Sequence, residues 1–354
     1  MRVEDYMRET PEKMKEIIQN ADQLFAEVRT LNIERMIVTG SGTSFHAGLQ
    51  TQKLMQRLTG IRVDAYYPFM IDKETFIGDN SKTLVIGISQ GGASNSTYGA
   101  MKLAKEAGCM VASMAGKEGA VIDEAADYIL TVHCGEEKAG AKTKGYYCTK
   151  LNLTLLALQI ARETSKLTEN EYANDIASIE KSADQFLKTY HASLDWINTN
   201  KEKLTQAKDI RVIGTSEIYG DTLEGALKLL ETMRIPVTGY EFEEFIHGIY
   251  NAINEDSTII ILDTGVEPRV EKMVKVLSGW TNSIYVIGNK GNVPDSSQNL
   301  KTEFINHQYY KTYEYIIPIQ MICAQIPILK GVDPSIPKDP QFHQKLESKI
   351  GDVD

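Results

Sequence analysis

The sequence predicts an α/β protein made of two similar halves, each with a parallel sheet. Short apolar strands alternate with segments of helical periodicity along the 354 residues, which is the pattern of parallel sheets covered by helices. Three strand-like segments of the first half also recur in the same order in the second half. We therefore expect a pseudo-symmetric duplication, with two tandem α/β/α sandwiches.

The three recurring segments keep nearly one offset. They pair residues 38–41 with 212–215, residues 84–86 with 259–261, and residues 111–114 with 284–287, at offsets of 174, 175 and 173 residues. A shared offset over three strands favours duplication of a domain over chance similarity.

The elements divide the chain into five segments. Residues 1–30 are expected to be helical, because apolar residues such as Met14 and Ile18 recur at helical spacing. The remaining segments are a first sandwich, a helical connector, a second sandwich and a C-terminal tail, at 31–167, 168–209, 210–331 and 332–354. Three prolines between 334 and 340 prevent a single helix in the tail.

Composition excludes several classes of function. The formal net charge is −10, whereas broad nucleic-acid surfaces are basic. No apolar run reaches the roughly 18 residues that span a bilayer, and the first residues lack the apolar core of a signal peptide, so we expect a cytoplasmic protein without a membrane partner. The four scattered cysteines favour reduced thiols over disulfides. The six histidines show no metal-binding spacing, so no metal is expected.

Two turns rich in glycine and hydroxyl residues are the most informative feature. The first, 40–44 (Gly-Ser-Gly-Thr-Ser), follows the apolar segment 36–38, and the second, 89–94 (Ser-Gln-Gly-Gly-Ala-Ser), follows 84–88. In adjacent strand–turn–helix units, such turns present backbone N–H groups and hydroxyls around one small volume. Neither turn contains a carboxylate, so the volume suits a phosphate rather than a cation.

Two other interpretations of these turns stay open. The first turn matches part of a dinucleotide-binding fingerprint, with Asp64 near the position of a ribose-binding acid, but Phe45 replaces the third glycine. Ser44 and Ser94 could also serve only as helix caps. Caps rarely need two glycines and several hydroxyls at both turns, so phosphate binding is favoured.

Segment 222–231 predicts an amphipathic helix with a charged stripe. Glu224, Lys228 and Glu231 are spaced i, i+4 and i+7, beside an apolar face that includes Leu230. Periodicity alone favours a solvated stripe with weak salt bridges. Position favours a functional role, because the helix follows a strand at 210–214, at the edge where α/β sheets bind ligands.

Two further segments carry candidate groups. His247 lies among acidic and apolar residues; such a histidine is usually a hydrogen-bonded core residue, but nearby acids favour a protonated ring that could donate to a sugar oxygen. The loop 134–144, after a strand expected at 128–132, places lysines beside small residues. That loop suits either an anion or simple exposure to solvent.

In this order, the motifs resemble those of the sugar isomerase (SIS) domain family, most closely the isomerase half of glucosamine-6-phosphate synthase and its stand-alone relatives. The shared pattern is a Gly-Thr-Ser turn, a Ser-Gln turn, a Thr-Lys loop, a Leu-Glu-Gly-Ala-Leu-Lys-Leu helix and a Glu-x-x-His-Gly segment, and it covers about residues 31–334. The resemblance implies two flavodoxin-like SIS domains, a small-molecule sugar phosphate as ligand, and a homodimer.

The resemblance also implies roles for individual residues. Glu231 corresponds to the general base that moves a proton between the first two sugar carbons, and Lys228 to a lysine near those carbons. His247 corresponds to a histidine that helps to open the sugar ring, usually in the neighbouring subunit. The phosphate-binding positions of the family correspond to Ser44, Ser89, Gln90, Gly91 and Ser94. Its sugar-binding positions correspond to Thr43, Glu137 and Gly140.

Several departures from the family pattern shape the expected activity. Gly91 and Ala93 replace a serine and a glutamate of the family turn, and Ile249 replaces the proline after His-Gly. The tail lysine of the synthase, which forms a Schiff base with the ketose, has no counterpart in register, and Lys338 is only a nearby candidate. The chain has no room for the glutaminase domain of the synthase, so synthase activity is not expected.

We therefore expect an enzyme that acts on an amino-sugar or ketosamine 6-phosphate, by aldose–ketose isomerisation with deamination or deglycation. The deglycases of fructosamine 6-phosphates resemble this pattern, since they keep the glutamate and histidine without the tail lysine. No cofactor is required, because the carbonyl or imine of the substrate acidifies the proton that moves. The alternative is a regulatory protein that binds a sugar phosphate without turnover; the presence of both Glu231 and His247 favours the enzyme.

Overall fold

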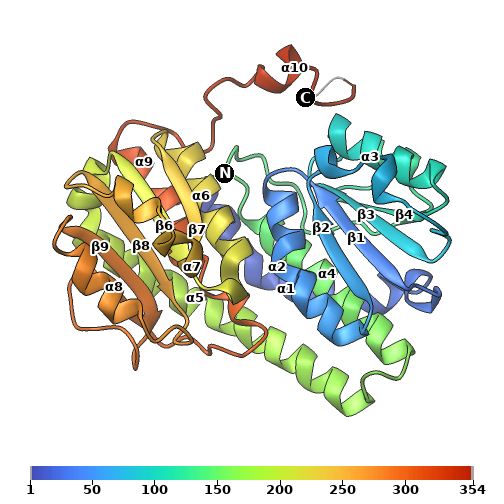
Figure 1. The fold of residues 1–354 in the computed structure, drawn as a ribbon, viewed down its shortest axis with the longest axis horizontal. Helices are drawn as coiled ribbons and strands as arrows, with labels where there is room; N and C mark the ends of the chain where they lie inside the picture. Colours follow the sequence, from blue (N-terminus) through green and yellow to red (C-terminus); the bar gives the residue numbers. More distant parts are fainter. Residues whose placement is uncertain (1, 352–354) are drawn as a thin grey trace. The chain divides into compact units, whose positions relative to one another are not determined.

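The computed structural model describes residues 2–351 and contains two parallel five-stranded sheets (Figure 1). The strand order is β2-β1-β3-β4-β5 in the first sheet and β10-β9-β8-β6-β7 in the second, which is the same order read from the opposite edge. Neighbouring strands pair in parallel in both sheets. The predicted α/β fold with a duplicated parallel sheet is therefore confirmed.

The strand bounds show how regular the duplication is. The first sheet consists of β1 (Arg35–Gly40), β2 (Arg62–Tyr66), β3 (Thr83–Ser89), β4 (Met110–Ala115) and β5 (Tyr128–Ile129). The second consists of β6 (Asp209–Gly214), β7 (Val237–Glu241), β8 (Ser257–Asp263), β9 (Ser283–Asn289) and β10 (Leu300–Thr302). β6 and β8 each begin 174 residues after β1 and β3, so the middle offset is one residue less than expected. β5 is shorter than the expected strand at 128–132, because only two of its residues pair with β4.

Helices follow most strands. They are α1 (Val3–Leu24), α2 (Thr43–Thr59), α3 (Asn95–Glu106), α4 (Lys144–Glu163), α5 (Glu169–Gln206), α6 (Tyr219–Met233), α7 (Phe242–Ile246), α8 (Val270–Leu277), α9 (Ile317–Leu329) and α10 (Phe342–Lys345). β3 and β8 are buried along their whole length, as expected of apolar strands covered on both faces. No helix among residues 2–351 is long and apolar enough to cross a membrane.

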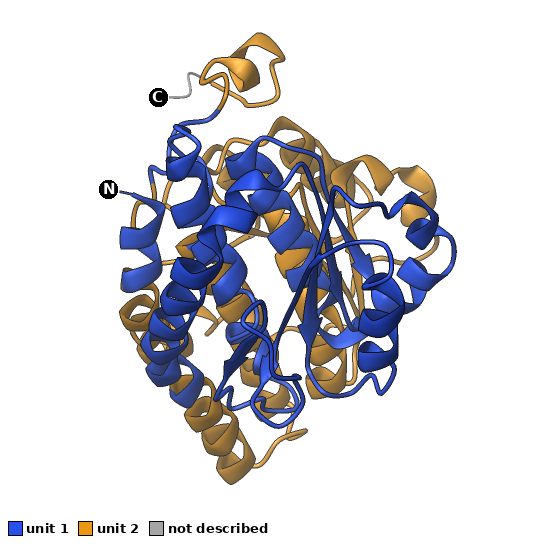
Figure 2. Ribbon diagram, turned by 90° about the vertical axis from the view of Figure 1, so that its left-hand side faces the viewer, with its two compact units in different colours: residues 1–8, 138–143, 181–337 blue, residues 9–137, 144–180, 338–354 orange. Residues whose placement is uncertain are grey.

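The chain folds into two compact units, each with one sheet (Figure 2). The unit with the first sheet is built from residues 9–137 and 144–180 and from the tail after residue 337. The unit with the second sheet is built from the chain up to residue 8, from 138–143 and from 181–337. The five segments expected from the sequence stay a prediction.

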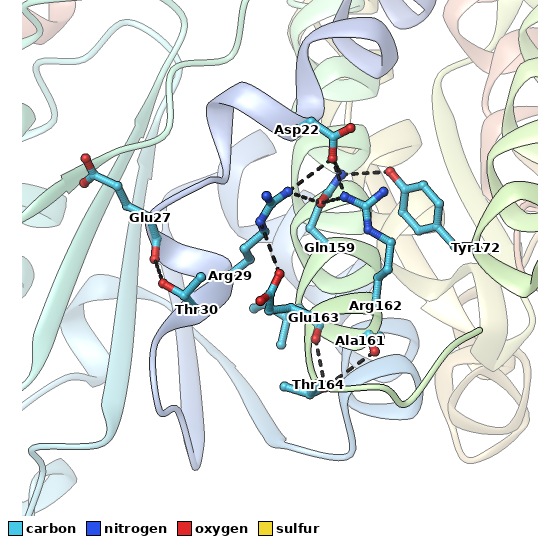
Figure 3. Close-up of polar contacts among 11 residues, drawn as sticks. Asp22, Glu27, Arg29, Thr30, Gln159, Ala161, Arg162, Glu163, Thr164 and Tyr172 are labelled. Atoms are coloured by element: carbon cyan, nitrogen blue, oxygen red, sulfur yellow. Dashed lines mark hydrogen bonds and ion pairs between the residues drawn. The ribbon is translucent and has the colours of Figure 1, made fainter. Parts of the chain in front are cut away.

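A polar network joins α1, α4 and α5 within the first unit (Figure 3). Gln159 donates to Asp22 and to the Tyr172 hydroxyl, both at 2.8 Å, and Arg29 donates to Gln159 at 2.9 Å. Arg162 also pairs with Asp22. Burial alone would raise the pKa of Asp22, but the hydrogen bonds from Gln159 and Arg162 lower it below its ordinary value of 3.8. The ionised carboxylate therefore helps to hold these three helices together.

Replacing Asp22 by Asn should destabilise the protein by about 1 kcal/mol at neutral pH, a small effect because water screens this partly exposed ion pair. Since the folded-state pKa of Asp22 is lowered, its contribution is present above the unfolded-state pKa and is lost as the pH falls through the folded-state pKa. Urea unfolding of wild type and D22N should give midpoints that differ at pH 7 and approach each other at pH 3. E27Q, which alters an exposed carboxylate nearby, is the matched control and should keep the wild-type midpoint. Equal midpoints for D22N and wild type at pH 7 would contradict the prediction.

Candidate functional site

The two turns rich in glycine and hydroxyl residues lie together at the carboxyl edge of the first sheet. β1 and β3 are neighbours, with Gly40 opposite Ile88, so the turns that follow them emerge side by side. The Oγ atoms of Ser41 and Ser96 are 3.4 Å apart, and Ser96 Oγ lies 3.3 Å from Ser94 Oγ. A row of three hydroxyls therefore connects both turns. The sequence analysis missed Ser96, although the hydroxyl-rich run 94–97 was a visible signal.

The first turn depends on its glycines. A Cβ atom on Gly40 would lie 2.7 Å from the carbonyl oxygen of Ile88, and Gly42 has a φ of 54°, a conformation that side chains disfavour. Gly42 is the N-cap of α2 and provides no side-chain cap. Thr43 is the first residue of α2, and Ser44 is buried in its first turn. The interpretation of Ser44 as a simple cap is therefore wrong, and the uncapped helix start suits an anion.

The second turn is partly a helix cap. Ser94 is the N-cap of α3, and its Oγ accepts the backbone N–H of Thr97 at 3.4 Å, so the capping interpretation holds for this residue. Ser89 is buried at the end of β3, where its Oγ accepts the N–H of Ser94 at 3.3 Å. Gly91 is exposed and offers only backbone groups. The turn thus has both a rigid frame and open donors.

The side chain of Gln90 is held from several sides. Its Nε2 donates to the Cys134 sulfur at 3.1 Å, and its Oε1 accepts the Thr149 hydroxyl at 3.4 Å. A Cβ atom on Gly116 would lie 2.3 Å from this Nε2, and one on Gly145 would lie 2.9 Å from the Gln90 Cδ. Both glycines therefore make room for the amide group, which has little freedom to move.

The C-terminal tail pairs with the second turn in the same unit. The N–H of Ile350 donates to the Ala93 carbonyl at 2.8 Å, and the N–H of Asn95 donates to the Ser348 carbonyl at 3.1 Å. The result is an antiparallel bridge between the tail and the residue that caps α3. Residues 348–350 thus act as a short added strand on the turn.

Glu137 is buried at the N-terminus of α4. Its two carboxylate oxygens accept the backbone N–H groups of Lys144, at 3.2 Å, and Gly145, at 2.9 Å. The Lys144 ammonium is buried too and pairs with Glu9 at 2.6 Å. The described contacts of Glu137 are those of a helix cap, which satisfies backbone donors and complements the helix dipole. Its expected contact with a sugar stays a prediction.

In the other unit, Gly140 lies against the start of the tail. Its N–H donates to the Ser335 carbonyl at 2.8 Å, and a Cβ atom here would lie 3.2 Å from the ring of Pro337. A larger residue would press on this segment. The expected role of Gly140 near a sugar stays a prediction, while Lys338, the candidate replacement for the tail lysine, is exposed.

Helix α6 turns its charged stripe inward. Glu224 and Lys228 are buried, whereas Leu230 of the expected apolar face is 44% exposed, so the interpretation of a solvated stripe is wrong. The Lys228 ammonium lies 2.6 Å from the carboxylate of Glu231 and 3.8 Å from that of Glu224. Burial alone would lower the pKa of Lys228, but the two carboxylates raise it above its ordinary value. Lys228 is therefore an ammonium at neutral pH, and Glu231 is its partly exposed neighbour.

His247 lies at the C-terminal end of α7 and is not a core residue. Its side chain is 74% exposed, and its Nε2 is 3.8 Å from the carboxylate of Glu243, one helical turn earlier. Glu243 also pairs with Arg269. The interpretation of His247 as a core histidine is therefore wrong, and most of its ring remains accessible to another molecule.

The equivalent edge of the second sheet is chemically different. At the 174-residue offset, Ile218 and Asp263 stand where Ser44 and Ser89 stand in the first copy. Nearby, Glu217 accepts a threonine hydroxyl at 2.6 Å. Burial would raise the pKa of Glu217, but this hydrogen bond and others lower it. The second edge therefore carries negative charge and does not suit a phosphate.

Metal ligands are not grouped in this protein. Within residues 2–351, no three or more histidine, cysteine, aspartate or glutamate side chains are arranged to hold a metal ion.

Comparisons with known proteins agree with this architecture. A family model described as the SIS domain matches residues 31–159. A candidate phosphosugar isomerase of Clostridium difficile 630 is 59% identical, with a TM-score of 0.96 that covers 100% of this chain and 99% of that one. A candidate sugar-binding protein of Salmonella typhimurium LT2 is 44% identical, with a TM-score of 0.86 and coverage of 92% and 99%.

A curated relative carries a similar half. Glutamine–fructose-6-phosphate aminotransferase (isomerizing) of Thermococcus kodakarensis is 28% identical over 344 residues, which are 94% of this chain and 56% of the relative. The chain thus spans about half the length of the curated relatives it matches. From the sequence, the paired sheets and these matches together, we conclude that the chain belongs to the SIS-domain family of phosphosugar isomerases.

Proposed function

We propose that the protein is an enzyme acting on an amino-sugar or ketosamine 6-phosphate, in which a proton moves between the first two sugar carbons and the nitrogen substituent leaves by deamination or deglycation. The observation that carries this proposal is the arrangement on α6, where a buried ammonium lies against a partly exposed carboxylate. A protein that only binds a sugar phosphate has no need of this pair.

In the proposed reaction, Glu231 is the base. It takes the proton from one sugar carbon and returns it to the next through an enediol or enolamine. Lys228 stays protonated at neutral pH because its pKa is raised, so it stabilises the oxyanion that develops beside it. A neutral amine for Schiff-base formation is not available at this position under those conditions.

The phosphate of the substrate is proposed to bind at the two turns of the first sheet. The row of Ser41, Ser96 and Ser94 hydroxyls, the uncapped start of α2 and the amide of Gln90 supply donors without any carboxylate. Such a site binds the dianion equally well in the ground and transition states, and its contribution to the reaction is orientation. The curated relatives are isomerizing aminotransferases, which supports a sugar-isomerising step in the shared half.

A panel of phosphosugars tests the proposed activity. It consists of glucosamine 6-phosphate, fructose 6-phosphate with ammonia, and fructosamine 6-phosphates of several amino acids, with products identified by mass spectrometry. We expect turnover of at least one compound, and E231Q should reduce kcat about 10²- to 10⁴-fold while substrate affinity is kept. E271Q, which alters an exposed carboxylate of α8, is the matched control and should keep the wild-type rate. Binding without turnover by the wild type would refute the enzyme and leave a regulatory sugar-phosphate sensor.

We also propose a homodimer in which His247 opens the sugar ring in the site of the neighbouring subunit. The exposure of its ring, 74% for the side chain, supports this role. E231Q and H247A should each be inactive alone, whereas their co-expression should restore about a quarter of the wild-type activity, because each mixed dimer regains one intact site. A monomer by sedimentation, or no recovery in mixed dimers of confirmed composition, would contradict the shared site.

The tail is proposed to close over the phosphate-binding turn. Its backbone pairing fixes the turn around Ser94, so loss of one hydrogen bond should weaken the binding of inorganic phosphate about fivefold. I350P removes the N–H that reaches the Ala93 carbonyl, and I350A keeps it. Calorimetry should show weaker binding for I350P and near wild-type binding for I350A. Equal affinity of both variants would show that the tail pairing does not support the site.

A further inference from the structure

We propose that Cys134 and Cys148 form a redox-sensitive dithiol that supports Gln90, and that a peroxide converts the pair into a disulfide which weakens phosphate binding. The inference rests on the proposed function, because Gln90 affects the ligand only if the second turn binds phosphate.

The two thiols lie in one unit, buried and in contact. Cys134 is in the irregular segment after β5, and Cys148 is on α4. The thiols are hydrogen-bonded to each other, and the Cys134 sulfur also accepts the Nε2 of Gln90 at 3.1 Å. The sulfur of Cys134 is therefore the direct support of a side chain in the phosphate-binding turn.

The two sulfurs differ in their readiness to react. The hydrogen bonds from Cys148 and Gln90 lower the pKa of Cys134, while burial raises that of Cys148. Burial also raises the pKa of Cys109 to about 11 and of Cys323 to about 12. Because the thiolate is the reactive form, Cys134 is the expected nucleophile and Cys148 the resolving thiol.

The oxidation balances with one peroxide. The Cys134 thiolate attacks a peroxide oxygen, the O–O bond breaks, and hydroxide leaves to give a sulfenic acid. The Cys148 sulfur then attacks the sulfenic sulfur, expels a second hydroxide and forms the S–S bond. The two thiol protons neutralise the two hydroxides, so that one hydrogen peroxide becomes two waters and two thiols become one disulfide.

The disulfide affects Gln90 through geometry. Forming it draws the two sulfurs to about 2.0 Å from each other and removes the thiolate that accepts the Gln90 amide. Since Gly116 and Gly145 leave no space for the amide to follow, Gln90 loses its fixed orientation. A phosphate that holds Gln90 should, by reciprocity, slow the oxidation of the pair.

Peroxide reaches the pair by a short path. Gln90 is half-buried, and its side chain directly covers the Cys134 sulfur. The stretch 130–137 contains neither helix nor strand, and such segments open locally at low cost in free energy.

The test treats the full-length protein with hydrogen peroxide and measures intact mass, disulfide peptides and the affinity for inorganic phosphate. We expect a loss of about 2 Da, a Cys134–Cys148 peptide and about tenfold weaker phosphate binding, all reversed by dithiothreitol. Inorganic phosphate should slow the cross-linking relative to chloride at equal ionic strength. C148A should form no such cross-link, and C109S, which alters a buried cysteine of the same unit, is the matched control and should behave as the wild type.

Two results would overturn the inference: no cross-link between Cys134 and Cys148 while the protein remains folded, or a cross-link that leaves the phosphate affinity unchanged. A reduced wild type that binds neither phosphate nor any phosphosugar would instead refute the proposed function together with the control of Gln90. Cross-link formation would then still decide whether the dithiol exists.

Discussion

The parallel pairing of β1 with β3 is the constraint on which the candidate site depends. With Gly40 opposite Ile88, the chain leaves both strands at the same height, and the hydroxyls of the two turns meet across a few ångströms. A register slip of one residue would also turn every side chain of the strand to the opposite face. The absence of a side chain at Gly40 belongs to the same constraint, since any Cβ atom there would collide with the neighbouring strand. An anion site built from uncharged atoms follows directly from this geometry.

Helix α6 shows a cost that the fold accepts for chemistry. Burying an ammonium with two carboxylates carries a desolvation penalty that apolar residues of similar size would avoid. The helix nevertheless exposes Leu230 and buries Glu224 and Lys228. A sequence selected only for stability would place these residues the other way round, so the inward charges are best explained by a reaction that needs them.

The sequence was sufficient for the features that depend on local pattern. Alternating apolar segments and a constant offset predicted the two sheets, and the composition of the 40–44 and 89–94 turns predicted donors at one edge. Periodicity could not decide which stripe of α6 faces inward, because the charged and apolar stripes have the same spacing. The contact of Gln90 with Cys134 and the cap formed by Glu137 depend on tertiary packing, which the order of residues along the chain does not reveal. The roles of Glu231, His247 and the phosphate-binding residues in catalysis and binding stay predictions.

The duplicated sheet has kept its shape and lost its chemical symmetry. Where the first copy presents Ser44 and Ser89, the second presents Ile218 and Asp263, with an ionised Glu217 alongside. Two scaffolds of equal topology therefore differ in the sign of the potential at corresponding edges. One consequence concerns stoichiometry: each chain has a single edge suited to a dianion, so a sugar bearing phosphates at both ends would find one end welcomed and the other repelled. Monophosphorylated sugars are thereby separated from bisphosphorylated ones by electrostatics rather than by size.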